Sequence, residues 1–169
     1  MSRTGGFAAI ALTALAITGC GSSAKPTPTN PAATSPTKTT AVTREQFAAK
    51  LDDICKRGNT LAAGTQPQVT KAMNAGDYAA AATAAEKINR DLKPLAAELA
   101  SLTPPPSEQA AFARYTKANA RISGLRIRLV QAIKAGDLDQ LRELDALVES
   151  EQKHRTTAAI DLGTTECGS

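Results

Sequence analysis

The chain has 169 residues and a formal net charge of +4, with 3% aromatic residues and no tryptophan. Arg3, Lys25 and Lys38 all precede residue 43, so the remainder carries a charge of only +1, which gives no reason to expect a nucleic-acid partner. The scarcity of aromatic rings also disfavours single-stranded nucleic acid, because bases bind such proteins by stacking on those rings.

Residues 1–19 have the layout of a secretory signal. Arg3 supplies a positive charge, and an apolar run over 7–17 follows it. This run is shorter than the roughly 20 residues of a membrane-spanning helix. Charge, short apolar run and small residues, in this order, are typical of a removable export signal. The alternative is that 7–17 forms a buried helix.

The sequence Ile17-Thr18-Gly19-Cys20 resembles the lipobox of bacterial lipoprotein precursors. The resemblance implies a lipoprotein signal peptide over 1–19, cleavage after Gly19 and a diacylglyceryl group on the Cys20 sulfur. Two acyl chains make a durable anchor. We therefore expect lipid anchoring at the cell membrane, on its extracytoplasmic face. The alternative is an ordinary cysteine behind an ordinary export signal.

Residues 20–42 are predicted to be the lipidated cysteine and a disordered tether. The stretch 21–42 is rich in serine, threonine and proline, lacks acidic residues and has almost nothing to bury. The folded domain is then expected over 43–169, which is long enough for one hydrophobic core.

This domain is predicted to be all-α, an antiparallel bundle of about four helices. The first helix begins with a capping box in which Thr43 is the cap and Gln46 reaches back. Gly64 and Pro67 are expected to end it, with a short helical turn over 68–75 behind them. Its buried face consists of apolar residues at helical spacing: Phe47, Leu51, Ile54 and Cys55.

Two glycine–aspartate pairs separate the later helices. Gly76-Asp77 precedes a helix over 78–102, and Gly136-Asp137 lies between helices over 107–135 and 138–162. Glycine favours the position just past a helix, and aspartate favours the cap of the next one. The predicted buried faces are Tyr78, Ala81, Ala85, Ile88, Leu92, Leu95, Leu99 and Leu102, then Tyr115, Ala118, Ile122, Leu125, Leu129 and Ala132, then Leu138, Leu141, Leu144, Leu147 and Val148.

Cysteine usage predicts one disulfide. With Cys20 assigned to lipid, Cys55 and Cys167 remain as an even pair in an oxidising compartment. The alternative is two free or metal-binding thiols. A zinc site is short of ligands, because the chain contains one histidine, so no metal site is predicted.

The domain resembles small disulfide-clipped helical domains in lipoproteins and secreted proteins of high-GC Gram-positive bacteria. The resemblance covers most of 43–168, and its motifs are structural. That family has no assigned activity, so the resemblance implies no catalytic residue. The motifs are Asp53-Ile54-Cys55, Leu102-Thr103-Pro104-Pro105, Ala135-Gly136-Asp137, Leu162-Gly163 and Cys167-Gly168.

The sequence contains few residues that could form a catalytic site. His154 is the only histidine and could form an acid–base pair with Glu151, but it lies in a polar stretch typical of a solvated helix face. Asp52 and Asp53 are adjacent, so they point to different sides of a helix. The chain has no phosphate-binding glycine loop. We expect no enzyme activity and no cofactor.

A basic stripe is the clearest charge signal. Arg114, Lys117, Arg121 and Arg128 fall on one face of the helix over 107–135. They could contact anionic lipid headgroups or cell-wall polymers. The alternative is pairing with the acidic helix over 138–162, although exposed ion pairs add little stability.

An alanine-rich stripe over 79–85 either permits close helix packing or leaves a cavity for an apolar ligand. The sequence therefore favours a non-catalytic binding or interaction module with an unknown envelope protein as partner. The alternative is a carrier or sensor of a small hydrophobic ligand.

Overall fold

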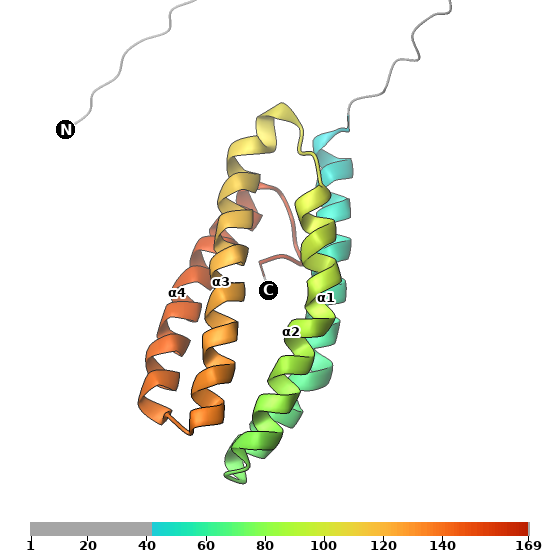
Figure 1. The fold of residues 1–169 in the computed structure, drawn as a ribbon. Helices are drawn as coiled ribbons and strands as arrows, with labels where there is room; N and C mark the ends of the chain where they lie inside the picture. Colours follow the sequence, from blue (N-terminus) through green and yellow to red (C-terminus); the bar gives the residue numbers. More distant parts are fainter. Residues whose placement is uncertain (1–41, 169) are drawn as a thin grey trace, which may run out of the picture. The chain divides into compact units, whose positions relative to one another are not determined.

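The computed structural model describes residues 42–168, and these form an antiparallel bundle of four α-helices (Figure 1). No strand occurs among them, so the predicted all-α fold is confirmed. The predicted signal and lipobox, and the tether as far as residue 41, lie outside the described residues. The helices are α1 (Arg44–Asn74), α2 (Tyr78–Ser101), α3 (Gln109–Ala135) and α4 (Leu138–Asp161), with a short 3-10 helix η1 (Pro106–Glu108) before α3.

Helix α1 is longer than the sequence indicates. It continues through Gly64 and Pro67 to Asn74, so the predicted end at these residues is wrong. Pro67 removes the hydrogen bond to the carbonyl of Ala63, but both residues are exposed, and water can satisfy that carbonyl. Further along, Met73 packs against a buried cluster on α2 and α3, and this packing holds the last turns of α1 in place.

Local sequence signals set the other helix ends. Thr43 and Gln46 form the predicted capping box, with Gln46 N donating to Thr43 Oγ1 at 3.2 Å and Thr43 N donating to Gln46 Oε1 at 3.1 Å. Asp77 and Asp137 cap α2 and α4 by accepting from the backbone N–H three residues on, at 2.9 Å in each case.

The two glycine–aspartate turns have the same geometry. Gly76 and Gly136 adopt left-handed φ angles of 72° and 65°, which glycine reaches without steric cost. Asp77 N donates to Ala72 O at 2.9 Å, and Asp137 N donates to Ala132 O at 3.0 Å. These are the hydrogen bonds of a Schellman motif. The prediction that each glycine–aspartate pair ends one helix and begins the next is therefore confirmed. We call this end of the bundle the Gly-Asp end.

The core is divided into two clusters along the bundle. The larger cluster lies where α1 begins and α4 ends, and in it the rings of Phe47 and Phe112 meet edge to face with centroids 5.2 Å apart. The smaller cluster lies toward the Gly-Asp end and joins α2 to α3. Its members are Ala81, Ala82, Val130 and Ile133.

The segment after α4 connects the end of the chain to α1. A disulfide joins Cys55 to Cys167, which confirms the predicted pairing. Asp52 strengthens this connection, since its carboxylate accepts from Thr165 N at 3.0 Å and from Glu166 N at 2.8 Å. Figure 1 shows this segment between α1 and the α3–α4 pair. We call it the C-terminal clip (residues 162–168).

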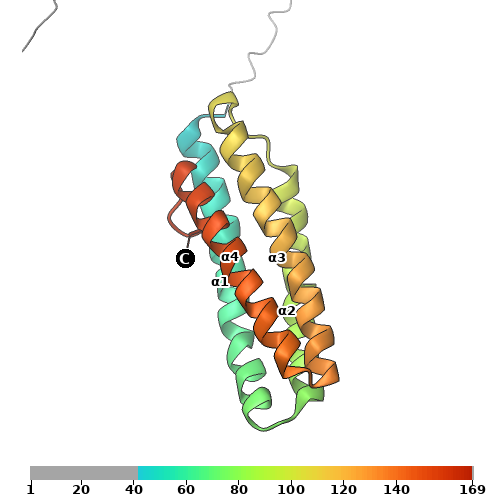
Figure 2. The same ribbon diagram turned by 90° about the vertical axis from the view of Figure 1, so that its left-hand side faces the viewer.

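The helices pack in sequence order, α1 on α2, α2 on α3 and α3 on α4, while α1 and α4 make no comparable helix-to-helix contact. Figure 2 shows α4 inclined to α1 rather than parallel to it. The C-terminal clip bridges these two helices only in the half of the bundle that contains Cys55. Toward the Gly-Asp end α4 moves away from α1 (Figure 2), whereas α2 and α3 stay packed together, and the separation of α4 from α1 shapes the site described next.

Candidate functional site

A groove with a volume of about 590 Å³ lies in the half of the bundle where α4 moves away from α1. It opens to solvent, and side chains from all four helices line it. Its volume lies within the range of roughly 300–1,000 Å³ that is usual for small-molecule sites. We call it the central groove. Most of its wall is apolar, through Ala62, Val69, Met73, Ala85, Ile88, Leu129, Val130, Ile133, Leu138, Leu141 and Val148.

The alanine-rich stripe of α2 has both of the roles considered for it. Ala81 and Ala82 are fully buried and pack against Val130 and Ile133 of α3. Ala85, one turn further, lines the central groove. The small side chains therefore bring α2 close to α3 near the Gly-Asp end and leave space beside Ala85.

The central groove meets a smaller polar hollow of about 130 Å³ near the disulfide. Ala62 and Arg126 line both. The polar side chains of the hollow include Asn119, Arg126 and Arg155. Burial, and secondly the positive charge of Arg155, lowers the pKa of the Arg126 guanidinium. An arginine nevertheless stays protonated, so Arg126 places a positive charge where groove and hollow meet.

Tyr115 forms part of the same hollow and is buried against the disulfide. Its hydroxyl lies 3.0 Å from Cys55 Sγ and must be the donor, because a disulfide sulfur carries no hydrogen. Burial raises the pKa of the Tyr115 hydroxyl. The hydroxyl therefore remains protonated and acts as a donor rather than as a base.

The basic stripe is partly neutralised by α4. Arg114 pairs with Asp161 and Arg121 pairs with Glu151, each at 2.8 Å. These contacts agree with the pairing alternative for both arginines. Lys117 and Arg128 form no ion pair within residues 42–168. The predicted face thus separates into two paired and two unpaired cations.

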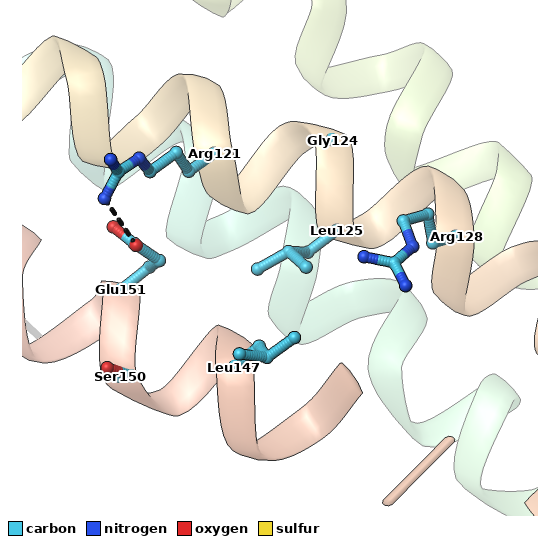
Figure 3. A pocket seen from close by; sticks show the side chains of 7 residues that line it. All are labelled: Arg121, Gly124, Leu125, Arg128, Leu147, Ser150 and Glu151. Atoms are coloured by element: carbon cyan, nitrogen blue, oxygen red, sulfur yellow. Dashed lines mark hydrogen bonds and ion pairs between the residues drawn. The ribbon is translucent and has the colours of Figure 1, made fainter. Parts of the chain in front are cut away.

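A second hollow, the outer pocket of about 350 Å³, lies between α3 and α4 on this basic face. In Figure 3, Leu125 and Leu147 lie between the two helices, with the Arg121–Glu151 pair on one side and Arg128 on the other. The pocket is shallow and only two helices form it. The central groove, formed by four helices, encloses a ligand better.

His154, Asp52 and Asp53 make contacts that stabilise the fold rather than form a catalytic group. His154 Nδ1 lies 3.5 Å from Glu151 Oε2, but the histidine is exposed and Glu151 already binds Arg121. Asp52 accepts hydrogen bonds from the C-terminal clip, while Asp53 pairs with Arg57 at 3.0 Å. The two adjacent carboxylates therefore act separately, as the sequence indicates.

Within the described part of the chain, no three histidine, cysteine or acidic side chains gather as a metal site would require. Across the same residues, none of the helices has the length and apolar character needed to span a membrane.

Arg126, and the contribution of α1 and α4 to the groove, are not among the site features predicted from the sequence. One signal marks Arg126. It lies four residues after the buried Ile122 and four before the buried Val130, so it occupies a core position of α3. A lone arginine in a buried apolar stripe is unusual, and this pattern indicates a special role for Arg126.

Comparison of the chain with protein-family profiles, curated protein sequences and solved structures finds no significant match.

Proposed function

We propose that the protein is a lipid-anchored envelope lipoprotein whose helical domain binds a small hydrophobic ligand in the central groove without transforming it. The single observation that supports ligand binding is the groove itself, about 590 Å³ in volume and mainly apolar. Its position beside Ala85 favours the carrier or sensor over a module with a closed core. The role is binding because the polar residues around the groove include no nucleophile paired with a base.

The anchor rests on the sequence Ile17-Thr18-Gly19-Cys20 and on the apolar run before it. A Cys20→Ala variant is expected to lose its lipid and move from the detergent phase to the aqueous phase when lysed cells are partitioned, because the thiol is the acceptor for the acyl chains. Ser22→Ala is the matched control and is expected to partition like wild type. A Cys20→Ala protein that stayed in the detergent phase would refute the anchor.

The groove can be tested by filling it. Ala85→Phe is expected to weaken binding of the neutral fluorescent probe N-phenylnaphthylamine by about 10-fold, because the ring occupies the space that the probe would use. Ala97→Phe is the matched control, since Ala97 is an exposed residue of α2 outside the groove. Titration of probe fluorescence gives both affinities. A wild-type domain that does not bind the probe, or an Ala85→Phe domain that binds it unchanged, would contradict the proposal.

The interaction module remains as a second candidate, and one specific observation favours it. The outer pocket places Arg128 beside the exposed Leu147 on one face of the α3–α4 pair. Such an apolar centre with a cationic edge suits contact with an anionic envelope surface. Native mass spectrometry of residues 39–169, purified gently from an oxidising compartment, separates the two. A retained adduct released by denaturation favours the carrier, and a bare monomer favours the module.

A further inference from the structure

Arg126 is placed where an apolar residue would be expected. It continues the stripe of α3 that contains Ala118, Ile122 and Val130, all of which are buried. Its own side chain is partly buried and lines both the central groove and the polar hollow. A charged group in such a position is costly unless an opposite charge accompanies it.

Arg126 has no anionic partner among residues 42–168. No carboxylate there forms an ion pair with it, and burial and the charge of Arg155 on α4 both act against its positive charge. Asp145 is the acidic residue of the groove lining, and it makes no ion pair with Arg126, while Arg142 of the same lining pairs with Asp139. The junction of groove and hollow thus combines positive charge with reduced contact with water.

The apolar part of the groove begins at this junction and extends toward the Gly-Asp end. Along α3 the wall continues from Arg126 through Val130 to Ile133, and α1 and α2 face it with Met73 and Ile88. From Arg126 to Ile133 the axial rise is about 10 Å, at roughly 1.5 Å per residue. Arg126 therefore offers polar recognition at one end, and apolar side chains of α1, α2 and α3 form most of the wall beyond it. The other polar residues of the lining are Gln66, Asn89, Arg142, Asp145 and Gln152.

We propose that the central groove binds an amphiphile with one anionic head group, a carboxylate or a phosphate, and a hydrocarbon tail. The head group contacts the Arg126 guanidinium, and the tail follows the wall formed by Ile88, Val130 and Ile133. Arginine suits both head groups, because its planar donors match the oxygens of a carboxylate or a phosphate. This inference rests on the proposed ligand-binding function, since it names the chemical class that the same groove would take.

The test compares three probes that share one tail, namely dodecanoate, dodecyl phosphate and dodecanol. Each is titrated by calorimetry, below its aggregation concentration, into residues 39–169, which include the whole described bundle with its core. The variants are Arg126→Gln, Arg126→Lys and Lys117→Gln. Lys117→Gln is the matched control, because it removes one positive charge from the same helix at an exposed position outside both hollows.

Dodecanoate or dodecyl phosphate is expected to bind wild type at least about 10-fold more tightly than dodecanol, because a hydrogen bond to a charged group is worth that ratio or more. Arg126→Gln is expected to abolish this preference while leaving dodecanol binding unchanged, which shows that the groove is intact. Arg126→Lys keeps part of the preference, and Lys117→Gln keeps all of it. The anion that binds wild type more tightly identifies the head group.

The outcomes separate this inference from the proposed function. Equal binding of all three probes, or a preference for the anions that survives in Arg126→Gln, overturns the role of Arg126 and leaves a hydrophobic groove in place. If none of the three probes binds wild type, both the groove function and the head-group inference are wrong.

Discussion

Removing the disulfide with the double substitution Cys55→Ala and Cys167→Ala is expected to lower the free energy of unfolding by about 4–5 kcal/mol. The two cysteines are 112 residues apart in sequence. In the chain-entropy description, closing a loop of this length removes that much conformational freedom from the unfolded chain. For a domain of this size the loss corresponds to a fall in Tm of about 15 °C.

Urea unfolding and thermal melts followed by circular dichroism measure this effect. Cys20→Ala serves as the control, because it removes a cysteine outside the domain and is expected to leave unfolding of the domain unchanged. A loss below about 2 kcal/mol would show that the hydrogen bonds of Asp52 to Thr165 and Glu166 hold the C-terminal clip on α1 without the covalent link.

The second large effect is expected at Leu144. This side chain is fully buried, with 0% exposure. Leu144→Ala should lower the free energy of unfolding by about 2–5 kcal/mol, because it removes apolar contact and leaves a cavity that the helices fill only partly.

Leu147→Ala provides the comparison within the same helix. Leu147 lies one turn after Leu144 but is 42% exposed, so its truncation should change stability by less than about 1 kcal/mol. Urea unfolding of both variants gives the two values. Equal losses would mean that Leu147 is covered in solution, and the reverse order would contradict the packing of α4.

The sequence predicts the helix boundaries that depend on local chemistry. Thr43 with Gln46, and the pairs Gly76-Asp77 and Gly136-Asp137, are found in the predicted roles because caps are formed by neighbouring residues. The end of α1 is the exception. Glycine and proline at 64 and 67 weaken the helix locally, but Met73 packs on a cluster contributed by α2 and α3, and no local pattern reveals that contact.

The disulfide could also be predicted, since only two cysteines remained once Cys20 was assigned to lipid. The central groove could not be predicted from the sequence. It depends on the inclination of α4 to α1 and on where the C-terminal clip crosses between them, and neither follows from the apolar spacing of a single helix. The same spacing predicts that Leu144 and Leu147 are both buried, although only Leu144 is.

The start of α1, where the chain enters the domain, lies far from the part of α1 that lines the central groove. The chain enters at Thr43, at one extremity of α1, whereas the α1 wall of the groove extends from Ala62 to Met73. At roughly 1.5 Å per residue, this wall lies about 28–45 Å along the helix from that entry point. The groove therefore lies away from the end at which the chain enters the domain, so the proposed ligand site would stay accessible in a protein held by the proposed anchor at Cys20.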